Sequence, residues 1–395
     1  MSPKVMERYT GGRKPMLTFA GAGMLGLAVT ALGWGVDTRR ALFSWLFAYA
    51  YWVGLAVAAL ILLGTWHASR ARWPVVLRRM LETMAGTLPL LALLFLPILL
   101  GAHELFLWTH ETPPLSEHEL ELLRHKQPYL NLPFWGARAA LYFALWIAVS
   151  ELLLRWSRRQ DESGELKLTT WQRRLGAGSL PAVAVALSFA SLDWLLSLEP
   201  LFVSTIFGLY YFAGAFVGVL AALTLATLLA RGPRLYGTLT NPSHLASLGK
   251  FLLAFTVFWA YIAYCQYFLI WIANLPAEVG WYIKRTTGAW EEVALAVVVG
   301  RFILPFFVLL SRPLKQSRAL LGVVAGWLLV AHALDVYWLV LPVVEPEGPA
   351  LHWADVAAFV GVGGSVVAFA LWRLRGHATL PVGDPYLYES LGYDE

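Results

Sequence analysis

The sequence predicts an all-α, polytopic membrane protein with about ten transmembrane helices, and three observations lead to this prediction. Of its 395 residues, 58% are hydrophobic and only 14% are charged, whereas an ordinary soluble domain has about 25% charged residues. The chain contains apolar runs long enough to cross about 30 Å of hydrocarbon. Lys and Arg are concentrated in alternate connections between these runs. Water is therefore not the main solvent of this chain.

The apolar runs are taken in order as ten spans. They lie near residues 15–35, 41–66, 82–103, 133–155, 177–197, 202–230, 249–274, 289–311, 319–341 and 354–373. A basic stretch precedes the first run, which has about twenty mostly apolar residues. Because the apolar core of a signal peptide has only ~7 to 15 residues, we interpret this run as an uncleaved first helix.

The distribution of Lys and Arg predicts the topology. Twenty-two of the 30 Lys and Arg residues lie in the N-terminal segment, in every second connection and in the C-terminal tail. Only six lie in the opposite connections, and two more, Arg138 and Arg301, lie inside predicted spans. Since Lys and Arg accumulate on the cytoplasmic side, both termini are predicted to be cytoplasmic.

This topology divides the chain into four parts. Residues 1–14 form a cytoplasmic N-terminal segment, 15–375 the membrane domain, and 376–395 a cytoplasmic C-terminal tail. Within the membrane domain, residues 104–132 form an outer, periplasmic loop that contains five glutamates. This acidic loop is either simply solvated or a docking surface for a periplasmic partner.

Ionisable side chains inside the predicted spans are the main candidates for chemistry. Each one at membrane depth costs on the order of 3 kcal/mol or more unless it has a partner, water or a function. On the predicted topology, the outer-side set is Arg138, Asp193, Arg301, His332 and Asp335, with His103 at the end of span three and the polar Gln266 in span seven. The inner-side set is smaller and within reach of the interface: Glu82, Glu151, Lys250 and His67. The sequence therefore predicts that buried charges are concentrated towards the outer side.

His332 and Asp335 are three residues apart, so they share one face of a helix. In one interpretation the carboxylate holds the imidazole, and the two form a proton-handling pair. In the other, Asp335 pairs with Arg301 or Arg138 as a structural ion pair. Asp193 likewise has two interpretations: a proton-exchanging carboxylate, or a hydrogen-bonding group at a helix end.

Several classes of site lack a motif. Cys265 is the only cysteine, which excludes a disulfide framework, a CxxC zinc site and a cysteine-ligated iron–sulfur cluster held by this chain alone. No span contains two histidines, so the paired ligands of a dihaem cytochrome b are missing, and a single haem between His103 and His332 is disfavoured. P-loop, GxSxG and HExxH motifs are absent. The basic residues occur in short clusters, so no nucleic-acid partner is expected.

Three stretches carry a resemblance to a known family. They are Ser191 to Phe216 (SLDWLLSLEPLFVSTIFGLYYFAGAF), Leu248 to Trp290 (LGKFLLAFTVFWAYIAYCQYFLIWIANLPAEVGWYIKRTTGAW) and His332 to Pro342 (HALDVYWLVLP). These strings resemble the ActF-like membrane subunit of bacterial alternative complex III, within the NrfD-like (PsrC-like) family. The likeness extends from about residue 15 to 375 and is weaker in the outer loop and the tails.

The resemblance implies an architecture and a setting. It implies two four-helix bundles plus flanking helices, in a subunit of the bacterial inner membrane. Alternative complex III is a quinol:cytochrome c/oxidase oxidoreductase. The resemblance implies ActA-, ActB-, ActC-, ActD- and ActE-like subunits as partners of this chain, and a terminal oxidase is a further candidate partner. Haem c and iron–sulfur clusters would belong to those partners, ubiquinone or menaquinone to the complex, and no cofactor to this chain.

The resemblance also implies a role in proton conduction. Asp193, Gln266, His332 and Asp335 lie in the matching strings, whereas His103, Arg138 and Arg301 are candidates by depth alone. We expect an outer half-channel in which His332 and Asp335 exchange a proton and Asp193 is a second carboxylate. The rival interpretations are a secondary transporter and a purely structural membrane anchor for redox subunits.

Overall fold

The computed structural model describes residues 8–232 and 235–394, and over these residues it is helical with no strand. The first seven residues of the predicted N-terminal segment and the last residue of the tail lie outside this part. Ten helical stretches are long and apolar enough to cross a membrane, as predicted: 13–36, 38–68, 75–100, 132–163, 166–198, 207–229, 242–273, 289–310, 318–343 and 353–374. The chain is therefore a multi-pass membrane protein.

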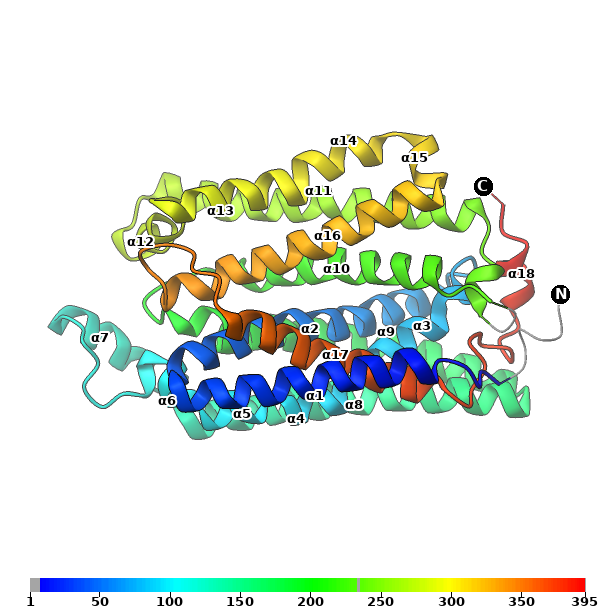
Figure 1. The fold of residues 1–395 in the computed structure, drawn as a ribbon, viewed down its shortest axis with the longest axis horizontal. Coiled ribbons are helices and arrows are strands. Elements are labelled where there is room, and N and C mark those ends of the chain that lie inside the picture. Colours follow the sequence, from blue (N-terminus) through cyan, green and yellow to red (C-terminus); the bar gives the residue numbers. More distant parts are fainter. Residues whose placement is uncertain (1–7, 233–234, 395) are drawn as a thin grey trace.

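The helices and their bounds follow the chain in the order of Figure 1. They are α1 (Arg13–Val36), α2 (Thr38–Ala68), α3 (Val75–Ala85), α4 (Leu88–Leu94), α5 (Leu96–Leu100), α6 (Ala102–Leu105), α7 (Glu117–Lys126), α8 (Leu132–Ser163), α9 (Leu166–Trp194), α10 (Phe207–Leu229), α11 (Pro242–Ala273), α12 (Pro276–Thr286), α13 (Ala289–Val298), α14 (Leu304–Leu310), α15 (Arg312–Gln316), α16 (Arg318–Val340), α17 (Trp353–Leu374) and α18 (Leu387–Leu391). Short 3-10 turns lie at Leu107–Thr109, Leu196–Leu198, Tyr236–Thr238 and Leu341–Val343, and a π turn at Val299–Ile303.

Two spans are interrupted where proline removes a backbone donor. Span three consists of α3 to α5, with α6 directly after it, and Pro89 and Pro97 each lie near the start of a new segment. Span eight consists of α13, the π turn and α14, with Pro305 directly after the π turn. Elsewhere the helices extend beyond the apolar runs: α8 and α9 continue through charged residues and are separated only by Gly164 and Glu165. The hydropathy of the sequence therefore identifies only the apolar part of each helix, and the helical hydrogen bonds continue beyond it.

The spans form two four-helix bundles, as the resemblance implied. In the first bundle α2, α3–α6, α8 and α9 pack together, and in the second α10, α11, α13–α14 and α16 pack together. Contacts of α10 with α2 and α9 join the bundles. The flanking helices α1 and α17 pack on each other, and α17 also packs on α2. Gly26 and Gly361 allow the close approach of α1 to α17, because a Cβ atom at Gly26 would lie 2.5 Å from the Gly361 nitrogen.

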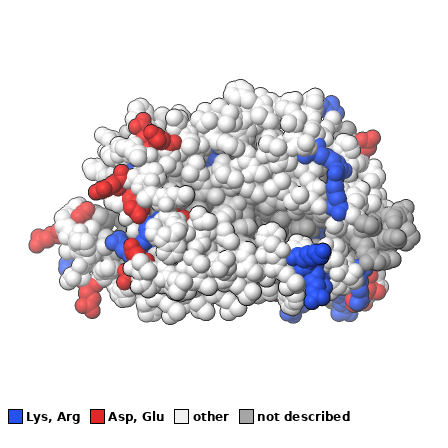
Figure 2. All heavy atoms as spheres, in the orientation of Figure 1, with Lys and Arg blue, Asp and Glu red and all other residues white. Residues whose placement is uncertain are grey.

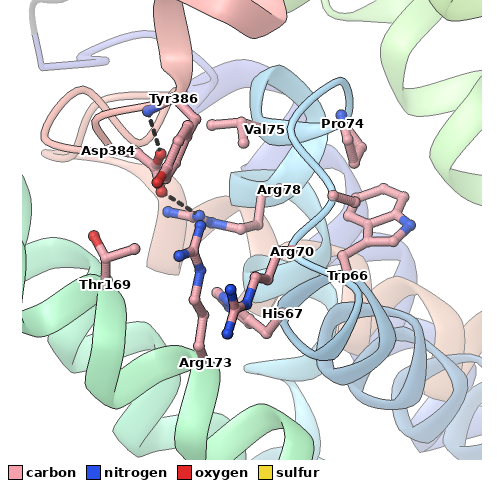
Figure 3. Close-up of a pocket in the computed structure, with 11 residues that line it drawn as sticks. Trp66, His67, Arg70, Pro74, Val75, Arg78, Thr169, Arg173, Asp384 and Tyr386 are labelled. Atoms are coloured by element: carbon pink, nitrogen blue, oxygen red, sulfur yellow. Dashed lines mark hydrogen bonds and ion pairs between the residues drawn. The ribbon is translucent and has the colours of Figure 1, made fainter.

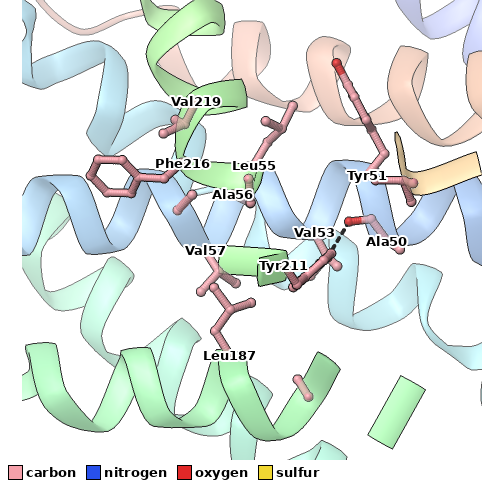
Figure 4. Packing of buried hydrophobic residues seen from close by; sticks show 14 of the residues in the cluster. Ala50, Tyr51, Val53, Leu55, Ala56, Val57, Leu187, Tyr211, Phe216 and Val219 are labelled. Carbon is pink, nitrogen blue, oxygen red and sulfur yellow. Dashed lines mark hydrogen bonds between the residues drawn. The ribbon is translucent and has the colours of Figure 1, made fainter. Parts of the chain in front are cut away.

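The central helix is α2, which is apolar almost throughout from Ala41 to Gly64 and is buried on nearly every side there. Its residues contact α9 and α10 in the core, and Figure 4 shows Val57 near Leu187 and the Tyr211 hydroxyl near the Ala50 carbonyl. That hydroxyl donates a hydrogen bond to the Ala50 oxygen at 2.6 Å. A helix without a polar face is expected at such a central position.

Charged residues gather at the two ends of the molecule. We call these ends the α7 end, with α6, α7 and α12, and the α18 end, with α15, α18 and residues 8–12 (Figure 1). On the face drawn in Figure 2, acidic residues cluster at the α7 end and basic residues at the α18 end, with a mostly uncharged band between them. The outer loop 104–132 contains α7, whose start is fixed by a capping box of Ser116 and Glu119. The sequence interpretation had not predicted this helix.

The C-terminal segment folds across the α18 end and contacts both bundles. Asp384 accepts a hydrogen bond from Arg78 of α3 at 2.5 Å, and the Ser390 hydroxyl donates to the Trp73 carbonyl at 2.6 Å. Farther along, Asn241 at the start of α11 donates to the Tyr393 carbonyl at 2.5 Å. These contacts cover the end of the first bundle and link it to the second.

Candidate functional site

The strongest candidate site is a buried ionic cluster in the second bundle. Arg301 forms an ion pair with Asp335, and the Tyr210 hydroxyl donates a hydrogen bond to the other oxygen of the same carboxylate. Arg301 also donates to the Gly214 carbonyl at 3.1 Å, and its guanidinium lies 4.4 Å from the ring centre of Trp259. All of these side chains are at most 4% exposed. We call these five residues the Arg301 cluster.

The π turn Val299–Ile303 places Arg301 in this cluster. Pro305 has no N–H group, so it cannot donate to the carbonyl of residue 301, and the helix is wider just before it. The Trp327 indole donates to the Gly300 carbonyl at 2.7 Å and so provides an external partner inside the turn. Single π turns within α-helices frequently occur at functional sites.

A cavity of about 860 Å³ lies beside the Arg301 cluster and is open at the surface of the second bundle, where Tyr261, Tyr264 and Leu295 of its lining are more than 60% exposed. Residues of α10, α11, α12, α13 and α16 line it, and Tyr210 and Trp259 are shared between its wall and the cluster. Most of the lining is apolar or aromatic, with Tyr282, Thr286 and Glu291 among the few polar groups. A mainly apolar cavity with a few convergent polar groups is typical of a ligand or substrate site.

Gln266 connects this cavity to the loop before α10. Its amide donates to the Tyr282 hydroxyl at 3.1 Å and accepts from the Ser204 hydroxyl at 3.0 Å. Gln266 is 2% exposed. The residue predicted by depth and by resemblance therefore lies one hydrogen bond away from the cavity lining.

His332 is buried in the second bundle but is not bonded to Asp335. Neither ring nitrogen has a hydrogen-bond partner, and the ring packs between α2 and α10, 5.1 Å from the Tyr51 ring centre. A Cβ atom at Gly218 would lie 2.9 Å from the His332 ring. The expected hydrogen bond of the pair is thus not formed, because Arg301 and Tyr210 occupy the carboxylate. For Asp335, the ion-pair alternative with Arg301 is the one observed.

Asp193 belongs to a separate cluster in the first bundle. Arg138 donates to its two carboxylate oxygens at 2.9 and 2.8 Å, and the Tyr142 hydroxyl donates at 2.8 Å. Asp193 is fully buried, and the Arg138 guanidinium lies 3.8 Å from the ring centre of Tyr129. Both carboxylate oxygens therefore have charged or hydroxyl donors. Asp193 and Asp335 are not members of one site.

His103 joins neither cluster. It is exposed in α6 at the α7 end, where its carbonyl bonds to the His110 ring at 2.7 Å. His332, in contrast, lies inside the second bundle and is 1% exposed. No contact links His103 to the polar residues of the spans in the described part of the chain.

Buried charges also occur at the α18 end, which corrects the one-sided distribution predicted from the sequence. Glu82 is 1% exposed and lies between Arg78 and Arg79, at 3.1 Å from each. Glu151 pairs with Arg373 of α17. Arg78 also pairs with Asp384, so the C-terminal segment and α17 both contact this group of charges. Of the predicted inner set, only Lys250 is exposed.

Sequence reasoning missed the tyrosines and several further ion pairs, among them those of Arg285 with Glu199, Arg79 with Asp161 and Arg40 with Asp355. Tyr210 and Tyr142 stand among many aromatic residues, so no local signal marked them. Arg40, assigned to an outer connection, is 4% exposed and donates to both oxygens of Asp355 at 2.8 and 2.7 Å. The acidic Asp355 at the start of the last span could have indicated that a basic partner such as Arg40 lies nearby.

In the described residues, no group of three or more His, Cys, Asp or Glu side chains is arranged to hold a metal ion. No family model matches this chain, and no curated protein has significant similarity to it. The resemblance to the ActF-like subunits therefore remains a prediction.

Proposed function

We propose that this membrane protein is an ActF-like subunit of a respiratory quinol-oxidising complex and that the Arg301 cluster handles protons in it. The sequence resemblance supports the family. One observation carries the proton-handling role: Tyr210 lines the cavity and donates a hydrogen bond to the buried carboxylate of Asp335. A proton in the cavity can therefore reach Asp335 through one hydroxyl group.

The chemistry follows from the charges of the cluster. Arg301 stays protonated, so its ion pair stabilises the ionised form of Asp335. When Asp335 takes up a proton, the buried Arg301 charge loses its partner, which favours release of that proton. Tyr210 can accept a proton on one side as it donates on the other. The cluster thus suits brief proton occupancy.

The cavity supplies a route towards one side of the membrane. Glu291, in the first turn of α13, lines it, and α13 begins near the α7 end. We assign the α7 end to the periplasm and both termini to the cytoplasm of a bacterial inner membrane, because Lys and Arg accumulate on the cytoplasmic side. Protons from Tyr210 would then leave or arrive on the periplasmic side.

In this proposal the chain has no redox centre of its own. Electrons from quinol pass through iron–sulfur and haem c groups of ActA- to ActE-like partners, and a terminal oxidase is a candidate acceptor. Lipids surround the chain, and ubiquinone or menaquinone belongs to the complex. The role of this subunit is to move protons as the quinol is oxidised elsewhere.

Gentle isolation from native membranes tests the family. We expect the tagged chain to co-purify with haem c and iron–sulfur subunits in a fixed ratio. A chain that is isolated alone and retains its fold would contradict the proposal and favour a secondary transporter.

Two matched tyrosine variants test the site. Y210F and Y142F each remove one hydrogen bond to a buried aspartate that is paired with arginine, but only Tyr210 lines the cavity. We expect Y210F to lower quinol:cytochrome c turnover at least several-fold in the assembled complex, and Y142F to change it little. Equal turnover in both variants would favour a purely structural anchor.

A further inference from the structure

A second, smaller cavity lies at the α18 end of the first bundle, at the opposite end from α7. It is enclosed by the end of α2, the start of α3, the helix α9 and the C-terminal segment. Its volume of about 20 Å³ is room for about one water-sized group. Figure 3 shows His67, Arg70, Arg78 and Arg173 around this space, with Asp384 and Tyr386 of the C-terminal segment beside them. We call it the arginine cavity.

Three buried nitrogen atoms of the lining residues lack a hydrogen-bond partner: Nη2 of Arg78, Nε2 of His67 and Nε1 of Trp66, and each residue is only 6% exposed. In Figure 3 the Trp66 nitrogen lies on the side of its ring away from the arginines, so the two donors at this space are those of Arg78 and His67. A guanidinium nitrogen is always a donor, and a neutral imidazole donates from one of its nitrogens. Because buried donors in folded proteins are nearly always paired, this cavity is expected to hold an acceptor.

The charge of the lining specifies the kind of acceptor. The positive charge of Arg78 is neutralised by carboxylates, since its Nε donates to Glu82 at 3.1 Å and its Nη1 to Asp384 at 2.5 Å. The other oxygen of Asp384 accepts from the Tyr386 backbone at 2.8 Å, so each oxygen of this carboxylate already accepts a hydrogen bond.

Two further cations remain at the cavity. Neither Arg70 nor Arg173 has an acidic partner within 4.0 Å in the part of the chain that the structure describes. Arg70 is exposed, and the Arg173 guanidinium is held 4.9 Å from the ring centre of Tyr386. The lining therefore carries a local excess of positive charge.

We propose that the arginine cavity is a phosphate-binding site. One phosphate oxygen fills the enclosed space and accepts from Arg78 and His67, and the other oxygens remain at the mouth, where Arg70 and Arg173 contact them. Planar guanidinium groups suit the oxygens of a phosphate. A single water would satisfy the two inner donors but would leave the two outer cations unbalanced.

Two sources present this chemistry: the headgroup of an anionic phospholipid and free phosphate. The position favours the lipid, because basic pockets between transmembrane helices bind lipid headgroups on the face where Lys and Arg accumulate. The site is independent of the Arg301 cluster and of the function proposed for it.

The test uses the purified full-length chain after removal of lipids, and two probes. Native mass spectrometry measures binding of added phosphatidylglycerol, and calorimetry measures binding of inorganic phosphate. R173Q removes one cation of the cavity, and R174Q is the matched control, because Arg174 is the next residue of α9 and does not line the cavity.

We expect wild type and R174Q to bind one of the two probes and R173Q to bind it about tenfold more weakly, as for the loss of one charge-assisted contact. Binding of phosphatidylglycerol alone identifies the lipid source, and binding of inorganic phosphate alone identifies the free anion. R70Q gives the same comparison if R173Q lowers the thermal stability. Equal binding by R173Q, R70Q and R174Q, or no binding of either probe by the wild type, would overturn the proposal.

Discussion

Replacing Asp335 with Asn removes the counter-charge of a buried arginine and leaves the shape of the side chain almost unchanged. Arg301 is 1% exposed, so no water replaces the lost carboxylate. It keeps the Gly214 carbonyl and the Trp259 ring as partners, but neither carries a full negative charge. Breaking one partner of a buried pair destabilises a protein by about 3 to 5 kcal/mol. For a chain of this length, D335N should lower Tm by about 4 to 6 °C.

The same account makes an opposite prediction for removing both charges. Replacing a buried ion pair with apolar groups of similar volume is often neutral or stabilising, so R301M/D335L should recover most of the loss seen in D335N. Thermal unfolding in one detergent, followed by tryptophan fluorescence, measures all variants on one scale. A D335N protein as stable as wild type, or a double variant less stable than D335N, would refute the burial argument.

Two further predictions concern packing and pH. G218L should lower the unfolding free energy by about 1 to 3 kcal/mol, because a Cβ atom there would lie 2.6 Å from Leu55. G326A is the control, because a Cβ atom at Gly326 meets no atom within 4 Å. Equal Tm values for the two variants would contradict the close packing at Gly218. Burial and nearby arginines, Arg158 first, lower the pKa of His377 to about 4, against about 6.5 when unfolded. The unfolded chain then binds more protons between these values, so this contribution to stability is present above pH 6.5 and is lost as pH falls towards 4. H377Q should show a shallower loss of Tm over that range, and parallel pH profiles would contradict the assignment.

The ten spans could be predicted because their signal is local. Hydropathy over about twenty residues is enough to identify each span. The distribution of Lys and Arg is consistent with connections that alternate between the two sides of the membrane. The breaks at Pro89 and Pro97 and the π turn before Pro305 were not predicted, since a hydropathy window averages over them. The boundaries of α8 and α9 were also missed, because helical hydrogen bonds continue through charged residues.

The site could be predicted only in part, because its contacts are not local. Asp335 and His332 were found as buried polar residues, but the partner of Asp335 lies 34 residues away in the sequence, and only the packing of α16 against the π turn selects it over His332. The burial of Glu82 depends on the C-terminal segment, which the sequence interpretation treated as a tail. Tyr210 had no local signal and is identified by its contacts alone.

The most direct test of proton handling is the number of protons released per electron transferred. The assembled complex is reconstituted into sealed vesicles, and acidification is measured while quinol is oxidised by cytochrome c, for wild type, Y210F and Y142F. If the Arg301 cluster handles protons, Y210F should release fewer protons per electron, and Y142F should match the wild type. The same proton yield in all three complexes, with assembly intact, would contradict the proposed role of this subunit.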